Sequence, residues 1–200
     1  MSELPELVVP RLSATDRLVE LDPVWLRDAR TGNPPRLRTA LRVGWRAGVL
    51  AVRFDGRDDG VVATHTRRDA PLWEEDVFEV FLSPGSPAHL YYELEVNPLG
   101  ALFDARIESP DLARATMRVE TAWACPGFEA HVTRGPNRWS ASLRIPLEPL
   151  GGGRIPPCWR ANFYRIDRGD PDEHSAWSPT LSDPADFHRP ERFGVLRLPV

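Results

Sequence analysis

Apolar and polar residues alternate in short runs along most of the chain, from about residue 39 onward. TALRVGWR (39–46) and VLAVRFDG (49–56) flank Ala47 and Gly48, which predicts two antiparallel strands joined by a tight hairpin turn. Three later runs have the length and composition of strands, and they are RWSASLRIP (138–146), WRANFYRID (159–167) and RFGVLRLP (192–199). The pattern therefore predicts many short strands and few helices.

Two further runs predict the centre of a sheet. VFEVFLS (77–83) is apolar on both parities, as expected of a strand that is covered on both faces. LYYELEVN (90–97) alternates, so one side faces the core while Tyr91, Glu93, Glu95 and Asn97 form a polar row. A Pro-Leu-Gly turn then returns the chain into ALFDARI (101–107), which predicts a second hairpin.

The fold class follows from these elements. Helical patterns are confined to DLARATM and to a turn near residues 146–150, and no repeat or break in composition marks a second domain. We expect residues 1–200 to form a single all-β domain, an antiparallel β-sandwich of jelly-roll or immunoglobulin-like type with long loops. Its core should span about residues 35–199.

Composition excludes some classes of partner. Hydrophobic residues make up 42% of the 200 residues and charged residues 27%, which is typical of a globular protein. The net charge of −4 gives no basic footprint for nucleic acid or for an anionic membrane, so neither partner is expected. The beginning of the chain has no basic, apolar leader, which predicts a cytoplasmic location, and basic residues that are all Arg suggest a GC-rich bacterial genome.

Two loops each carry a Trp in polar company. Trp73 precedes the strand that begins at Val77, and it shares parity with Glu79 if the chain there is extended. Trp177 lies in the long Pro- and Asp-rich segment 168–194, whose length indicates a functional loop. Sugars present apolar C–H faces and a rim of hydroxyl groups, so a sugar site needs aromatic platforms beside carboxylates or other hydrogen-bonding groups.

The candidate sugar site combines these residues. Trp73 and Trp177 would stack on the two faces of one ring, and hydroxyl groups would be bound by Glu79, Glu93, Glu95 and His174. A plainer interpretation stays open, because a Trp in a sandwich is more often part of the core and Glu79 could pair with Arg106 or Arg144. The other tryptophans are assigned to the core or its rim, and they are Trp25, Trp45, Trp123, Trp139 and Trp159.

A family resemblance favours the sugar site. The strings PLWEEDVFEVFL, YYELEVNPLGALFDARI, WRANFYRID and AWSPT, with FHRPERFG after it, resemble carbohydrate-binding module family 9 over roughly residues 35–199. The resemblance implies a non-catalytic β-sandwich in which two Trp side chains, here Trp73 and Trp177, hold a mono- or oligosaccharide, with Glu79 as the acidic residue. It also implies a link to polysaccharide catabolism and allows a calcium ion. Where the family has Arg and Asn on the next strand, this chain has Glu93 and Glu95.

Three alternatives remain at this stage. Glu93 and Glu95 lie on one strand face at roughly the spacing of a glycosidase carboxylate pair. The same sandwich superfamily includes haem-binding domains, for which Met117 with His89, His131 or His174 would supply ligands. Asp170 and Asp172 could bind calcium through oxygen, although no EF-hand spacing is present, so neither a metal site nor a cofactor is assigned.

Overall fold

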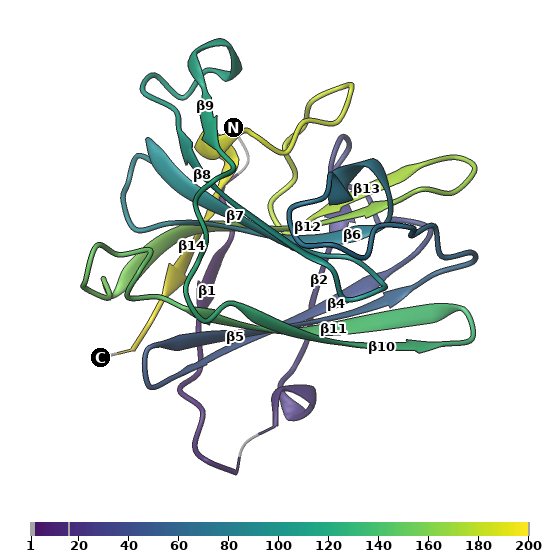
Figure 1. The fold of residues 1–200 in the computed structure, drawn as a ribbon, viewed down its shortest axis with the longest axis horizontal. Coiled ribbons are helices and arrows are strands. Elements are labelled where there is room, and N and C mark those ends of the chain that lie inside the picture. The colour runs from purple at the N-terminus through teal and green to yellow at the C-terminus, as the bar shows by residue number, and fades with distance from the viewer. Residues whose placement is uncertain (1–2, 16, 200) are drawn as a thin grey trace.

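The protein folds into two β-sheets that pack face to face in a sandwich, as a computed structural model that describes residues 3–15 and 17–199 shows (Figure 1). The strands are β1 (Glu6–Val8), β2 (Val24–Trp25), β3 (Arg27–Asp28), β4 (Thr39–Arg46), β5 (Val49–Arg57), β6 (Val77–Ser83), β7 (Leu90–Val96), β8 (Leu102–Glu108), β9 (Arg118–Glu120), β10 (Glu129–Gly135), β11 (Arg138–Pro146), β12 (Cys158–Asp167), β13 (Glu173–Ala176) and β14 (Gly194–Arg197). Four short 3₁₀ turns accompany them, η1 (Leu18–Glu20), η2 (Leu72–Glu74), η3 (Arg114–Thr116) and η4 (Pro190–Arg192). The expected all-β sandwich is confirmed.

The larger sheet has nine strands within the described part of the chain. Its strands run in the order β1-β14-β12-β6-β7-β8-β9, and β13 pairs with β12 and with β3 beside this path. All of these pairs are antiparallel except β1 with β14. The strands β6 and β7, predicted as central from their sequence, are central here, with Glu79 opposite Glu95.

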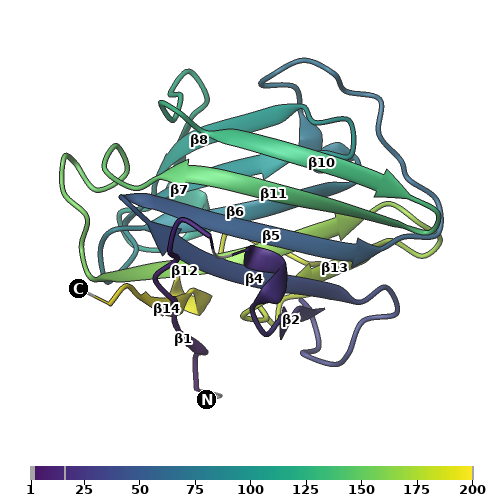
Figure 2. The ribbon, with the colours of Figure 1, turned by 90° about the horizontal axis from the view of Figure 1, so that it is seen from below.

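The smaller sheet has five described strands in the order β10-β11-β5-β4-β2 and forms the other layer (Figure 2). The hairpin of β4 and β5 turns at Ala47 and Gly48, whose φ angles are 49° and 80°. Two successive positive φ values are typical of the two-residue turn that matches the twist of a hairpin, and glycine adopts this conformation without strain. The predicted hairpin is therefore present, with both strands within one residue of the expected bounds.

The main core lies between the two sheets. Every second residue of β4, β5 and β11 points inward, and so does every second residue of β6, β7 and β12. Three rings of this layer, Phe54, Phe78 and Trp139, stack in a row with centroids 4.6 Å and 3.8 Å apart. Of the tryptophans assigned to the core or its rim, Trp25 is an exception because it is 44% exposed on the edge strand β2.

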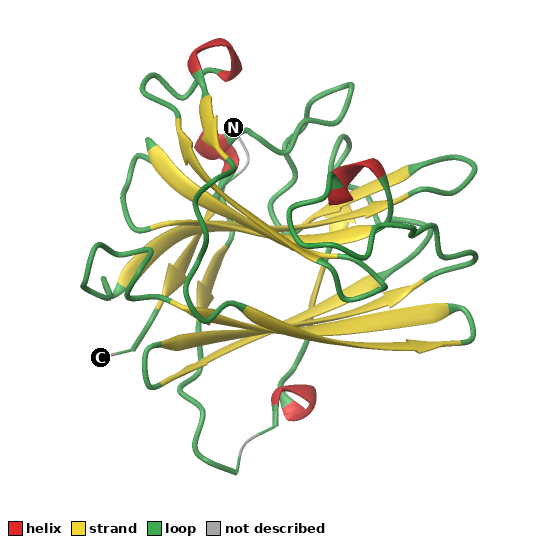
Figure 3. Cartoon of the chain, in the orientation of Figure 1, coloured by secondary structure: helices red, strands yellow, loops and turns green. Residues whose placement is uncertain are grey.

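A second apolar cluster covers the outer face of the nine-stranded sheet. It combines outward-facing strand residues such as Phe81, Tyr91 and Tyr164 with Leu72 of η2 and Phe187 from a loop. The face of β7 that the sequence predicted to be polar is buried here, because Glu93 is 6% exposed and Glu95 is fully buried. Loops that carry the 3₁₀ turns η2 and η3 rise above this face, as Figure 3 shows, and they cover part of it.

The segment 168–194 is only partly a loop. Residues Glu173–Ala176 form β13, which continues the sheet beyond β12 by pairing Ala176 with Tyr164 and His174 with Ile166. The sequence did not predict this strand, because its four residues EHSA carry no apolar alternation. No helix in the described residues has both the length and the apolar character needed to span a membrane.

A buried arginine joins the two sheets. Arg165 of β12 is 1% exposed and lies between the layers, where its guanidinium bonds Asp58, Asp167 and the Thr39 hydroxyl. Burial raises the pKa of Asp167 to about 7, although Arg165 opposes this shift. A side chain at Gly56 would meet this guanidinium, since its Cβ would lie 3.0 Å from Nη1 of Arg165.

Replacing Arg165 tests this network. Arg165→Met should lower the free energy of unfolding by about 3–5 kcal/mol, because two buried carboxylates lose their cation. Urea denaturation monitored by Trp fluorescence measures the change. Arg57→Met, at an exposed position on β5, serves as the control and should change stability by no more than about 0.5 kcal/mol. A loss below about 1 kcal/mol in Arg165→Met would contradict this account of the network.

Candidate functional site

A pocket of about 390 Å³ opens on the outer face of the nine-stranded sheet, within the size range of small-ligand sites. Its floor comes from β6, β7, β8 and β12, while β13, η2, η3 and the loop before η4 supply the walls. The lining residues are Trp73, Glu79, Glu93, Phe103, Arg114, Met117, Val119, Thr121, Ile166, Arg168, His174, Ala185, Asp186, Phe187 and His188. Four of the six residues predicted for a sugar site, Trp73, Glu79, Glu93 and His174, therefore line one pocket.

Trp73 provides an exposed aromatic surface in this pocket. It belongs to η2, which is anchored by the fully buried Leu72, and its own side chain is 41% exposed. The indole meets Phe103 edge to face at 5.0 Å, and the Trp73 carbonyl accepts a hydrogen bond of 2.7 Å from Arg168. These contacts hold the ring in place while leaving part of it free to stack on a ligand.

Three carboxyl groups meet at the floor. Glu79 of β6 lies opposite Glu95 of β7, and Glu93 is two residues away on the same face of β7. The three side chains are 2%, 0% and 6% exposed, respectively, and one oxygen of each lies within 4.8 Å of the others. The sequence predicted that Glu93 and Glu95 share a face, but it gave no sign of how deeply that face is buried.

Burial controls the protonation of this cluster. Desolvation raises the pKa of Glu93 to about 7, and it raises the pKa values of Glu79 and Glu95 well above the ordinary range. Repulsion by neighbouring carboxylates adds to the shift of Glu79 and of Glu95. Within the described structure, Oε1 of Glu79 is buried without a hydrogen-bond partner, and Glu95 shares a hydrogen bond only with Glu93. The expected alternative of a pair with Arg106 is not seen, because that residue bonds Glu108 and Glu120.

Two histidines line the walls. His174 packs edge to face against Phe187 at 5.8 Å, and burial lowers its pKa. His188 was not predicted as a site residue; its Nδ1 lies 2.9 Å from the Tyr91 hydroxyl and its Nε2 lies 4.0 Å from Glu93. Burial lowers the pKa of His188 to about 3, so the ring is neutral at physiological pH. Its place in FHRP has no spacing that distinguishes it from any loop histidine.

Trp177 does not belong to this pocket. Its side chain is 6% exposed in the core between the sheets, where it meets Phe163 edge to face at 5.6 Å. The physical reason is the alternation of the extended chain, since His174 and Trp177 are three residues apart and so face opposite sides. The indole also fills the space above Gly194, where a Cβ would overlap it. The prediction that Trp177 forms half of a two-Trp clamp is therefore wrong in this structure.

The geometry gives little support to the haem and glycosidase alternatives. Of the haem candidates, only Met117 and His174 line the pocket, whereas His89 contacts the Ser109 carbonyl at 3.2 Å and His131 lies on β10 of the other sheet. The Met117 sulfur accepts a hydrogen bond from Tyr91. Glu93 and Glu95 are adjacent members of one buried cluster, not two carboxylates on opposite sides of a cleft.

The structure gives little support to a calcium site at Asp170 and Asp172. Asp172 pairs with Arg168 at 2.6 Å, and neither Asp170 nor Asp172 gathers with other ligands among the described residues. A separate group of Asp58, Asp76 and Asp167 is buried. Arg165 already holds two of these carboxylates, and both oxygens of Asp76 accept backbone N–H bonds. These oxygens are committed to other donors and do not fit a cation site.

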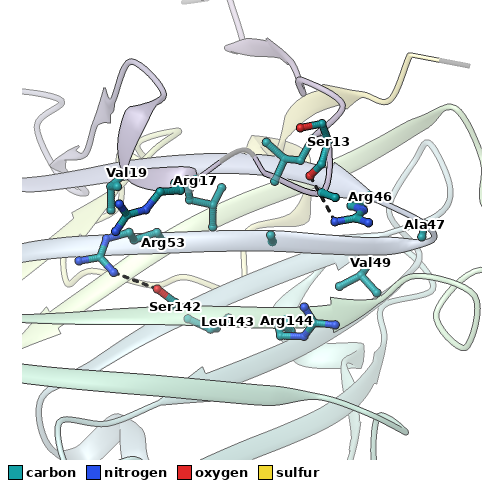
Figure 4. A pocket seen from close by; sticks show the side chains of 14 residues that line it. Ser13, Arg17, Val19, Arg46, Ala47, Val49, Arg53, Ser142, Leu143 and Arg144 are labelled. Atoms are coloured by element: carbon teal, nitrogen blue, oxygen red, sulfur yellow. Dashed lines mark hydrogen bonds between the residues drawn. The ribbon is translucent and has the colours of Figure 1, made fainter.

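A second hollow, of about 640 Å³, lies on the outer face of the five-stranded sheet (Figure 4). Arg17, Arg46, Arg53 and Arg144 line it, and Arg53 donates a 3.0 Å hydrogen bond to Ser142. Its described lining contains neither an acidic residue nor an aromatic ring. The hollow therefore lacks the stacking platform of a sugar site, and the expectation that nucleic acid is not a partner stays a prediction.

The fold and the pocket define a carbohydrate-binding β-sandwich module. The sequence matches the model of carbohydrate-binding family 9 over residues 32–198, so the chain belongs to that family. Members of the family are non-catalytic modules, in agreement with the expectation from sequence. A comparison with curated proteins found no match.

Solved structures of low sequence identity share the fold. A proposed carbohydrate-binding protein from Bacteroides uniformis superimposes with a TM-score of 0.77 at 16% identity, covering 98% of this chain and 100% of that one. A family 9 module from Caldicellulosiruptor kristjanssonii, in complex with cellotriose, gives 0.65 at 13% identity, covering 97% and 93%. The same organism's family 9 module in complex with glucose gives 0.61 at 14% identity, covering 98% and 96%.

The structural role of Trp177 can be tested by truncation. Trp177→Ala should lower the free energy of unfolding by about 3–5 kcal/mol, because it empties a large volume in the core. Trp73→Ala removes a half-exposed ring and should cost about 1 kcal/mol or less. Urea denaturation of both variants measures the difference. Equal losses would contradict the assignment of Trp177 to the core and Trp73 to the surface.

The buried carboxyl cluster should make stability depend on pH. Glu93 has an ordinary pKa of 4.5 and a folded value of about 7, so the folded protein keeps a proton that the unfolded chain releases in this window. The contribution of Glu93 is therefore present below the lower value and is lost as pH rises through the upper one. Glu93→Gln should flatten the fall in stability between these values. Denaturation at several pH values measures it, and an unchanged slope would contradict the assignment.

Proposed function

We propose that the pocket on the nine-stranded sheet binds one ring of a mono- or oligosaccharide without changing it chemically. The main observation in its support is that the pocket brings the exposed ring of Trp73 together with Glu79 and Glu93 at its floor. Membership of carbohydrate-binding family 9 supports it, and so do the sugars bound by family 9 modules of the same fold.

In this arrangement Trp73 stacks on the apolar face of the ring, which removes C–H groups and indole from water. Glu79 and Glu93 bind the hydroxyl groups at its edge. A carboxylate accepts hydrogen bonds from two neighbouring hydroxyls, and a protonated carboxyl also donates one. His174, a neutral ring, offers one donor and one acceptor to the remaining hydroxyls, and His188 offers only Nε2, because its Nδ1 is bonded to the Tyr91 hydroxyl.

The proposal replaces the two-Trp clamp by a single Trp platform. Phe187, which lies against Tyr164 with centroids 4.1 Å apart, closes part of the same pocket. Because only one large ring is exposed, sugar affinity should depend more on the carboxyl groups than in a clamp.

The test is calorimetric titration with glucose and with cellotriose. Trp73→Ala should weaken binding by about 1–3 kcal/mol, equivalent to roughly 5- to 150-fold, because stacking and apolar burial are lost. Trp25→Ala is the matched control, since that ring is similarly exposed, at 44% against 41%, and lies on the other sheet. Sugar binding that survives Trp73→Ala unchanged, or that Trp25→Ala weakens equally, would overturn the assignment of this pocket.

A further inference from the structure

The floor of the pocket holds more acid than the surrounding structure neutralises. Glu79, Glu93 and Glu95 form a cluster of three carboxyl groups on adjacent strands, each at least nine-tenths buried. Among the described residues, Oε1 of Glu79 has no hydrogen-bond partner, and Glu95 shares a hydrogen bond only with Glu93, which needs one of the two to be protonated. An unpaired buried polar group is costly, and natural structures usually keep one only where it meets a ligand or serves another function.

The cations near the pocket are already committed elsewhere. Arg168 pairs with Asp172 at 2.6 Å and donates to the Trp73 carbonyl, and Arg114 pairs with Asp186 at 2.9 Å. The two pocket histidines are neutral. No described side chain therefore makes a salt bridge shorter than 4.0 Å with any of the three floor carboxyl groups.

A primary ammonium group matches the chemistry of this floor. It carries three N–H donors, and each can make a charged hydrogen bond of about 2.8 Å to a carboxylate oxygen. Glu79 and Glu93 line the pocket, and one oxygen of each lies within 4.8 Å of the other and of Glu95. Glu95 is fully buried, does not line the pocket and shares a hydrogen bond with Glu93.

We propose that the ligand of this pocket is an amino sugar, a pyranose whose primary ammonium group binds Glu79 and Glu93 while its ring stacks on Trp73. This inference rests on the proposed function and specifies the class of sugar. Glucose places only neutral hydroxyls at the floor, so the buried carboxyl groups keep their raised pKa values and gain no charged hydrogen bond. N-Acetylation removes the charge of the amine and adds bulk, so the acetylated sugar binds no better than glucose.

A metal ion fits the floor less well. Calcium takes six to eight oxygen ligands, including carbonyl groups and water. The residues directly opposite the three carboxyl groups in the sheet are Tyr164, Phe81, Ala105 and Phe103, which offer a single phenol oxygen. The amide oxygen of Asn97, next on the same face just after β7, already accepts two backbone N–H bonds. The Tyr164 hydroxyl is already bonded to Asn162 and to the Phe187 carbonyl.

The experiment is calorimetric titration of the wild-type protein with glucosamine, glucose and N-acetylglucosamine at about pH 6.5, where a primary amine is protonated. Glucosamine should bind about tenfold more tightly than either neutral sugar, because charged hydrogen bonds replace neutral ones. Glu93→Gln and, separately, Glu79→Gln keep the shape of the floor and should reduce this ratio to about threefold or less. Trp73→Ala should weaken all three sugars.

Glu129→Gln is the matched control, because it makes the same substitution on β10 of the other sheet at a side chain that is 73% exposed. It should keep the wild-type ratio. Calcium chloride is titrated in parallel, with melting temperature as the readout.

Each result separates the two proposals. Glucosamine and glucose binding with equal affinity overturns the amino-sugar inference and leaves sugar binding intact. If Glu93→Gln and Glu79→Gln leave the preference for glucosamine unchanged, the amino-sugar inference is also overturned. No binding of any sugar overturns the proposed function and the inference together. If calcium stabilises the wild type but not Glu93→Gln, and glucosamine does not bind, the floor is a metal site and the inference is wrong.

Discussion

The structure depends on the coverage of the nine-stranded sheet on both faces. One face packs on the five-stranded sheet, and the other is covered by the loops of η2, η3 and the segment before η4. This second layer turns a polar strand row into a buried one, so the carboxyl groups of β6 and β7 lie in a medium of low dielectric constant. The raised pKa values and the lack of donors around these carboxyl oxygens both follow from this burial.

The fold was largely predictable because its strands alternate strictly. β4, β6 and β11 begin and end where the apolar pattern of the sequence begins and ends, and the β4–β5 turn has the Gly that its geometry favours. β13 was not predicted because EHSA shows no apolar pattern. It forms a strand because β12 extends beyond β14 and leaves the edge of residues 164–167 free for pairing. Pairing across 137 residues, such as that between Glu173 and Arg36, leaves no trace in local sequence.

The candidate site was predictable in part. Strand parity placed Glu79, Glu93 and Glu95 on one face, and Trp73 lies above that face as expected. Strand parity also explains why Trp177 does not face the pocket, because it lies three residues after His174 and so points to the opposite side. This argument can be made only once the strand β13 is known. His188, Phe187 and Arg168 reach the pocket from loops, where sequence carries no periodic signal for direction.

The arginines of the five-stranded sheet have a consequence for the molecule as a whole. Its outer face carries Arg42, Arg46, Arg53, Arg57, Arg138 and Arg144 against two acids, Asp55 and Glu129, in a chain whose net charge is −4. The remainder of the protein is therefore strongly negative, and the separation creates an electric dipole moment across the sandwich. In dilute salt the Debye length is long, about 30 Å at 0.01 M. The dipole moment then orients the arginine-rich face toward an anionic polymer before contact. The sugar pocket, on the opposite side, then faces away from that polymer.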